Sequence, residues 1–145
     1  DCGFELEFVP VPHRDELADT HAIVIRGPIR SLLFLPDHDD WGQTLARHGA
    51  NSVRQWLSVL GIDIALVDGS FWDSDELSGR DMSQIPHPTV TETIARLGER
   101  VEEDPEIHFI HLNHSNPLLE SGSNQSEEVS DLGWDVGRQG QHFAL

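Results

Sequence analysis

Two predicted buried strands constrain the fold of this chain more than any other feature of its sequence. Ile62–Val67 is a continuous apolar run broken only by Asp63, the pattern of a strand buried on both faces, and Ile107–Leu112 is predicted to be another buried strand. Between them, Thr89–Val101 has apolar residues at helical spacing and begins with a threonine that can cap a helix. Strand, helix and buried strand in this order predict the alternation of an α/β domain.

The first half of the chain has a different pattern, that of a β-meander. Phe4–Pro12 alternates apolar and polar residues, and two further short strands are predicted at Ala22–Ile25 and Ser31–Leu35. Trp41–Leu60 has roughly helical spacing with a break in the middle, which predicts two short helices or one interrupted helix. A meander followed by alternating strands and helices predicts an α/β domain with a mixed sheet.

Two stretches have no apolar periodicity. Phe71–Pro88 is predicted to be a long loop, and long loops in compact domains are usually functional or disordered. Ser121–Glu128 is polar and predicted to be mobile, and a short helix and a last strand near Trp134–Val136 are predicted to follow it.

The charge of the chain excludes two classes of partner. The 145 residues suffice for one domain that buries about two thirds of its unfolded surface. They include 9 basic and 26 acidic residues, a net charge of −17 without a basic cluster. Such a field repels phosphate, so neither nucleic acid nor a membrane surface is expected as a partner. The longest apolar run is also too short to span a bilayer.

The cysteine content and the first residues of the chain indicate its cellular location and whether further sequence precedes it. The single cysteine, Cys2, excludes an internal disulfide and a thiolate metal cluster. No signal peptide is visible, and a cytoplasmic location is expected. The chain begins at Asp1 rather than at methionine, so we expect further sequence upstream.

Three histidines and an aspartate lie in loops next to predicted strands: His13, Asp37, His87 and His111. Ligands of α/β sheets gather in the loops beyond the strand ends. Neutral imidazole and carboxylate groups are ligands of zinc and iron, and a catalytic site keeps one position for water. This placement favours a metal-dependent enzyme. The alternative is that the histidines are surface residues and that Asp37–Asp40 is a solvated acidic turn.

Five sequence blocks, in order, resemble a known family: VPVPHRDELADT, LLFLPDHDDW, IALVDGSFW, ELSGRDMSQIPHPTVTET and FIHLNHSNPLL. They are similar to the C-terminal half of metallo-β-lactamase-fold proteins, and most similar to the coenzyme PQQ synthesis protein B-like group. The resemblance implies that residues 1–145 form the C-terminal half of an αββα sandwich with a mixed sheet. The H-x-H-x-D-H motif of the N-terminal half, or its variant H-x-H-x-G-H, is absent from this sequence.

The resemblance also implies roles for particular residues. It implies that His13, Asp37 and His111 are metal ligands, with Asp37 placed to bridge two ions. His87 is implied to transfer a proton, and Asp68 to accept a hydrogen bond that orients an imidazole.

His114 departs from the pattern of the group, which tends to have asparagine there. This departure favours a related hydrolase branch and makes His114 either an additional ligand or a hydrogen-bond donor behind one. His108, His111 and His114 recur at every third residue, a spacing that would scatter them over both faces of a strand. The spacing alone therefore does not predict a three-histidine site.

The implied function is that of a metal-dependent hydrolase acting on a small molecule. Metal-bound hydroxide would attack an ester, amide or phosphoester-like bond, with His87 protonating the leaving group. Zinc is favoured, iron and manganese are alternatives, and one or two ions are expected. The alternatives are a PQQ-biosynthesis oxidoreductase or hydroxylase, and a non-catalytic acidic protein-binding module. A nuclease conflicts with the charge of −17.

Half of a sandwich leaves one face of its sheet uncovered, and exposed apolar faces mark interfaces. The expected partner is the missing N-terminal half of the same fold, and a homo-oligomer is the alternative. Without that half, the site is expected to be incomplete and the chain to have little or no catalytic activity.

Overall fold

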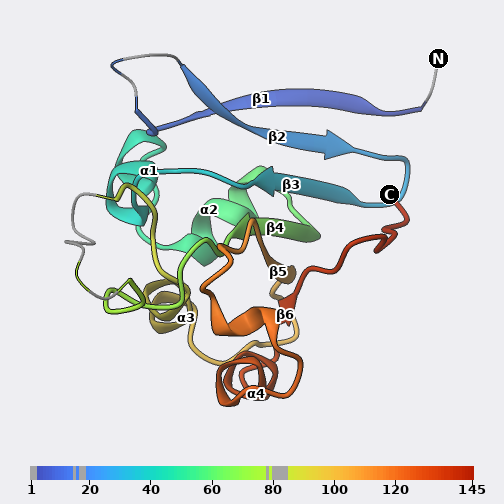
Figure 1. Ribbon diagram of the computed structural model, residues 1–145. Helices are drawn as coiled ribbons and strands as arrows, with labels where there is room; N and C mark the ends of the chain where they lie inside the picture. Colours follow the sequence, from blue (N-terminus) through green and yellow to red (C-terminus); the bar gives the residue numbers. More distant parts are fainter. Residues whose placement is uncertain (1–2, 15, 17–18, 78, 80–84) are drawn as a thin grey trace.

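A six-stranded mixed sheet organises the chain, in the spatial order β1-β2-β3-β4-β5-β6 (Figure 1). The computed structural model describes residues 3–14, 16, 19–77, 79 and 85–145. The strands are β1 (Glu5–Val11), β2 (Thr20–Arg26), β3 (Ser31–Leu35), β4 (Ile64–Asp68), β5 (Glu106–Ile110) and β6 (Asp135–Val136). The first three pair antiparallel, and β3 to β6 pair parallel. The expected α/β class with a mixed sheet is confirmed.

Within the described residues, four α-helices and one short 3-10 helix connect and cover the strands. They are α1 (Trp41–Arg47), α2 (Val53–Leu60), α3 (Val90–Leu97), η2 (Pro117–Leu119) and α4 (Asn124–Asp131). The interrupted helical region is therefore two helices. Side chains of Asp40, Ser52 and Thr89 cap the first turns of α1, α2 and α3. None of the helices in the described part of the chain is long and apolar enough to cross a membrane.

Two predicted boundaries were wrong. The predicted helix to Val101 ends at Leu97, because Gly98 adopts a positive φ of 66° that breaks the helical hydrogen bonding. The segment predicted to be mobile contains most of α4, because the Ser123 side chain accepts a hydrogen bond from the Ser126 N–H and caps the helix. Val129 is buried and holds α4 to the core. Residues 78 and 80–84 of the predicted long loop lie outside the described residues.

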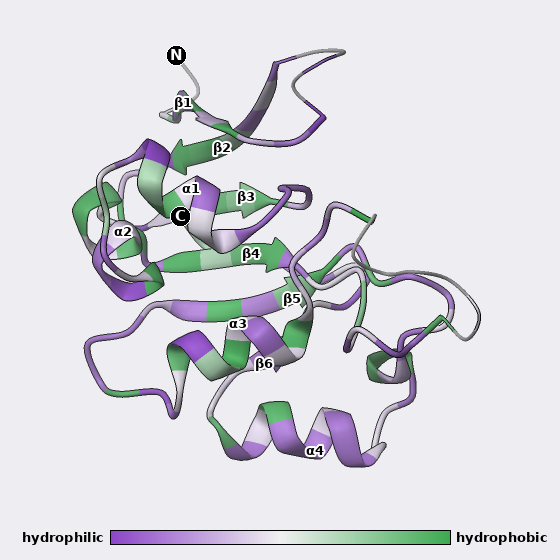
Figure 2. Cartoon of the chain, turned by 90° about the vertical axis from the view of Figure 1, so that its left-hand side faces the viewer, coloured by the Kyte–Doolittle hydropathy of each residue, from purple (hydrophilic) through white to green (hydrophobic). Residues whose placement is uncertain are grey.

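The helices bury one face of the sheet. Trp41, Trp56 and Leu97 are almost fully buried, in one cluster with alternate residues of the strands such as Leu33 and Val67. Figure 2 shows β3 and β4 as largely hydrophobic, whereas α4 is mostly hydrophilic. A continuous core on this side fixes the register of the central strands, and with it the loops that follow them.

The opposite face of the sheet is apolar and partly exposed. Phe8 pairs with Ile23, Ile23 with Phe34, and Phe34 with Leu66, which makes a row of apolar side chains across four strands. Phe8 is 63% exposed and Phe34 is 37% exposed. Among the described residues, none of the four side chains of this open face (Phe8, Ile23, Phe34 and Leu66) belongs to the buried core cluster.

The C-terminal segment covers another part of the same side. After β6 the chain runs back towards the β2–β3 turn (Figure 1), where Leu145 packs against Gly27. On the way, the ring of Phe143 contacts His108 edge-on, with 5.1 Å between ring centroids. The described structure thus shields β5 and leaves the β1 to β3 part of the face open.

Candidate metal centre

The topology brings the strand-end residues His13, Asp37, His87 and His111 to one edge of the sheet. β1 runs in the same direction as β3, because both are antiparallel to β2, and β5 is parallel to β3 through β4. The residues that follow β1, β3 and β5 therefore meet at the same edge. His87 reaches this edge from the loop that precedes α3.

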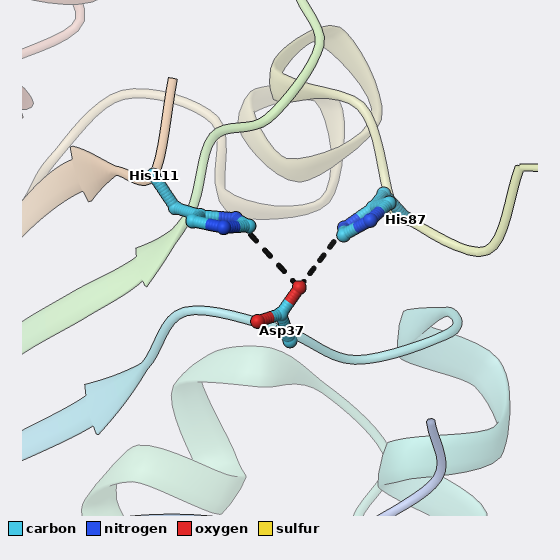
Figure 3. A group of neighbouring side chains, drawn as sticks. All are labelled: Asp37, His87 and His111. Carbon is cyan, nitrogen blue, oxygen red and sulfur yellow. Dashed lines mark ion pairs between the residues drawn. The ribbon is translucent and has the colours of Figure 1, made fainter. Parts of the chain in front are cut away.

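Asp37 is the centre of the group. Its Oδ1 atom lies 3.7 Å from Nδ1 of both His87 and His111, and 3.9 Å from Nε2 of His13. Figure 3 shows the rings of His87 and His111 approaching the carboxylate of Asp37 from two sides. Ligand atoms of Asp37, His87 and His111 all lie within 4.8 Å of one another.

This donor set fits a divalent metal ion. Zinc binds imidazole nitrogen and carboxylate oxygen at about 2.0–2.2 Å, so two of its ligand atoms lie roughly 3.3–3.5 Å apart in a tetrahedral site. Ligand atoms of the three residues lie within 4.8 Å of one another, which is somewhat wider than this spacing. Because Nδ1 of His87 and Nδ1 of His111 face Asp68 and Ser70, an ion would be held by the other nitrogen, Nε2, of each ring while those contacts persist. One carboxylate and two imidazoles, partly exposed at a sheet edge, leave room for water or substrate as a further ligand.

Each imidazole in the group also has an oxygen atom of its own nearby. The pairs are His13 Nδ1 with Asp39 Oδ1 at 3.3 Å, His87 Nδ1 with Asp68 Oδ2 at 2.7 Å, and His111 Nδ1 with Ser70 Oγ at 2.9 Å. Oxygen partners of this kind hold metal-binding histidines in orientation in many metalloproteins. The arrangement is therefore more specific than a chance meeting of polar side chains.

A tight turn after β4 positions two of these oxygens. The Ser70 N–H donates to Asp68 Oδ1 at 2.9 Å, and the Gly69 N–H donates to the Ile110 carbonyl at 2.9 Å. A Cβ atom on Gly69 would lie 2.9 Å from the Cβ of Phe109, so only glycine lets the turn approach the end of β5 this closely. The turn places Asp68 and Ser70, both buried, beside His87 and His111.

His111 has a backbone conformation unusual for a side-chain-bearing residue. Its φ of 61° lies in the left-handed region, which costs free energy and persists where the surroundings enforce it. The residue immediately follows β5, and the turn directs its ring back towards Asp37. Such strain is concentrated at functional sites.

The loop that carries Asp37 is anchored on both sides. The Asp39 N–H donates to the Pro12 carbonyl at 2.7 Å, which joins this loop to the end of β1 and hence to His13. His38 is fully buried, with its Nδ1 2.9 Å from Thr44 Oγ1. Burial lowers the pKa of His38 to about 4, so the ring is a neutral anchor at physiological pH.

Electrostatics distinguish His87 from the other histidines. Burial opposes the charged form, but the hydrogen bond to Asp68 and the charges of Asp68, Asp37 and Asp39 outweigh it and raise the pKa of His87. In the metal-free protein this ring therefore holds a proton more firmly than an ordinary histidine.

The remaining predicted site residue lies elsewhere. His114 is exposed, and its Nδ1 is 3.1 Å from the side-chain oxygen of the adjacent Asn113. It is not among the described residues whose ligand atoms converge. Sequence reasoning also missed Ser70, although the Asp-Gly-Ser turn after a buried strand was the available signal.

Comparison with known proteins identifies relatives of this chain. Coenzyme PQQ synthesis protein B from Ruegeria pomeroyi is 31% identical over 88 residues, which are 55% of this chain and 29% of that protein. The protein of the same name from Acinetobacter baumannii is 24% identical, over 99% of this chain and 51% of that protein. The chain thus spans about half or less of the length of these relatives. No family model matches the chain.

A solved structure shows the same fold. The crystal structure of Zn²⁺-bound PqqB from Methylobacterium extorquens matches with a TM-score of 0.67 and 21% identity, over 99% of this chain and 47% of that chain. The chain is therefore PqqB-like, and its mixed sheet matches part of the metallo-β-lactamase fold. The resemblance and the fold class expected from the sequence are confirmed.

Proposed function

We propose that this PqqB-like chain supplies the Asp37, His87 and His111 part of a divalent metal centre in a metal-dependent hydrolase of small molecules. The convergence of these three side chains within 4.8 Å carries the proposal. Zinc is the favoured ion, because the donors are of the type that zinc binds and because a zinc-bound PqqB shares the fold.

The side chains around the ion have separate tasks. A divalent ion held here would polarise an ester or amide carbonyl and acidify water towards neutral pH. Asp37 is within 4 Å of all three histidines, so its carboxylate is the group that would be shared if His13 helped to hold a second ion. Asp68 keeps His87 oriented through the 2.7 Å hydrogen bond.

His87 could act in two ways, and metal analysis separates them. Its position in the ligand group favours direct binding, so His87→Ala is expected to lower zinc affinity at least about 10-fold. His114→Ala is the matched control, because this exposed histidine lies outside the group, and its zinc affinity should equal that of the wild type. Both are measured by calorimetric zinc titration.

A different outcome would reassign His87. If His87→Ala keeps wild-type zinc affinity, the ligand role is wrong and the raised pKa favours proton transfer instead. Loss of affinity in His114→Ala would contradict the proposed ligand set.

We further propose that the open face of the sheet is covered by the N-terminal half of the same fold. The chain matches only 47% of the zinc-bound PqqB chain, and the exposed row from Phe8 to Leu66 is the apolar surface such a half would need. A buried apolar face between two sheets is the usual interior of a sandwich. The hydrolase activity is expected only when both halves are present.

Substitution on this face tests the proposal. Phe8→Ser is expected to change the unfolding free energy of this chain by less than about 0.5 kcal/mol, because the ring is 63% exposed. In a protein that carries both halves, the same change is expected to cost about 3–5 kcal/mol. Val9→Ala, on the buried face, should destabilise both forms. Equal effects of Phe8→Ser in the two forms would contradict the covered face.

The same two-half protein tests the chemistry. Zinc-dependent hydrolysis of a chromogenic ester, lost on addition of a chelator, is the expected result. A protein that binds zinc but cleaves no ester or amide would contradict the hydrolase proposal. Such a result would favour the second candidate, a redox or hydroxylation role in coenzyme PQQ synthesis, for which the relatives are named.

A further inference from the structure

We propose that Ser70 is a positioning residue of this centre and that its hydroxyl fixes the ring of His111. The expected effect on zinc binding rests on the proposed metal centre, whereas the distances between Ser70 and the two histidines do not depend on any ion. Ser70 is only 3% exposed, and its Oγ lies 2.9 Å from Nδ1 of His111 and 3.3 Å from Nδ1 of His87. The hydroxyl therefore stands between the two imidazoles.

His111 depends on this contact more than the other histidines depend on theirs. Its side chain is 48% exposed, against 15% for His87 and 20% for His13. Packing alone does not restrain a half-exposed ring. The carboxylate of Asp37 is farther from this ring than Ser70 is, at 3.7 Å from Nδ1. Ser70 is the group at hydrogen-bonding distance that keeps the ring directed into the centre.

The direction of the hydrogen bonds follows from the chemistry of the groups. An ionised Asp68 can only accept, so the Nδ1–H of His87 donates to it at 2.7 Å. The Ser70 oxygen faces the same N–H at 3.3 Å as a second acceptor. Its own proton is thus free to be donated to Nδ1 of His111.

A hydroxyl differs from a carboxylate in this position. It can donate to a bare imidazole nitrogen or accept from a protonated one, whereas a carboxylate only accepts. Ser70 can therefore hold the His111 ring before and after an ion claims one of its nitrogens. His87, which faces a carboxylate, is restricted to the form with a proton on Nδ1.

The test compares Ser70→Ala with a matched serine. Ser31 is also buried, and its hydroxyl bonds Gly61 and Asp63 near the opposite ends of the strands. Ser70→Ala is expected to weaken zinc binding at least about 10-fold, and Ser31→Ala is expected to leave it unchanged. Ser70→Thr keeps a hydroxyl and is expected to restore affinity to within about threefold of the wild type. Calorimetric titration with zinc gives the affinities.

A second readout needs no metal. The ¹⁵N shifts of the His111 ring in the metal-free protein should report one tautomer in the wild type and in Ser31→Ala. In Ser70→Ala they should report a mixture of tautomers. Unchanged ring shifts together with unchanged zinc affinity in Ser70→Ala would overturn the inference. If the wild type binds no zinc but the ring shifts still change, the positioning role stands and the proposed metal function fails.

Discussion

Replacing Asp37 with alanine is expected to weaken zinc binding by at least about 100-fold, more than any other single change in the site. Asp37 is the only carboxylate in the converging group, and its Oδ1 is the atom that both His87 and His111 approach. In Asp37→Ala, two neutral imidazoles would have to hold the divalent ion with no carboxylate to offset its charge. Loss of a group that merely orients a ligand already costs 10–100-fold. Calorimetry with zinc measures the change.

Two observations make this experiment specific. The Asp37 side chain is 33% exposed, so its removal is expected to leave the unfolding free energy within about 1 kcal/mol of the wild type. Asp73→Ala is the matched control, because Asp73 lies in a neighbouring loop and bonds the Asp75 N–H outside the group. Wild-type zinc affinity in Asp37→Ala would contradict the assignment.

Replacing Trp41 with alanine is expected to have the largest effect on stability, about 3–5 kcal/mol. The side chain is fully buried, and its Nε1–H donates to Thr93 Oγ1 at 2.9 Å. Its ring contacts the rings of His38 and Trp56, with centroid distances of 4.5 and 6.1 Å. The substitution opens a cavity between α1, α2 and α3 and leaves a buried hydroxyl without its donor. Urea unfolding at neutral pH measures the loss.

The control for this prediction lies on α2. Val59 is 77% exposed, and Val59→Ala should change the unfolding free energy by less than about 0.5 kcal/mol. A loss of less than 1 kcal/mol in Trp41→Ala would contradict the described core. Because Trp41 packs on His38, which is adjacent to Asp37, the core and the site are joined at this point.

The strands of the sheet could be predicted because each has a recognisable residue pattern within its own few positions. Ile64–Asp68 is apolar up to its last residue, Glu106–Ile110 contains three apolar residues, and β3 ends immediately before Pro36, which a central strand would not continue through. The ends of α3 and α4 could not be predicted as well. The end of α3 depends on the positive φ of Gly98, and the start of α4 depends on the Ser123 cap. Because glycine and serine are also common in loops, their presence in the sequence does not mark a helix end.

The candidate site likewise has residues whose meeting the sequence predicts and residues whose meeting it does not. His13, Asp37 and His111 follow strands that run in one direction, so the sheet order alone predicts their meeting. His87 was a candidate from its place next to a predicted strand, but its position depends on the path of a loop without periodicity, so its distance from Asp37 could not be predicted. The role of Ser70 could be recognised only from the 2.9 Å distance between its Oγ and Nδ1 of His111. In the sequence, a serine after Asp-Gly indicates an ordinary turn.

The most direct test of the central claim is zinc K-edge X-ray absorption of the zinc-loaded chain. The structure predicts nitrogen and oxygen ligands at about 2.0–2.2 Å, with outer scattering from two imidazoles. His111→Ala should reduce that imidazole scattering, whereas His114→Ala should leave it unchanged. An oxygen-only spectrum without imidazole scattering would contradict a metal centre built on Asp37, His87 and His111.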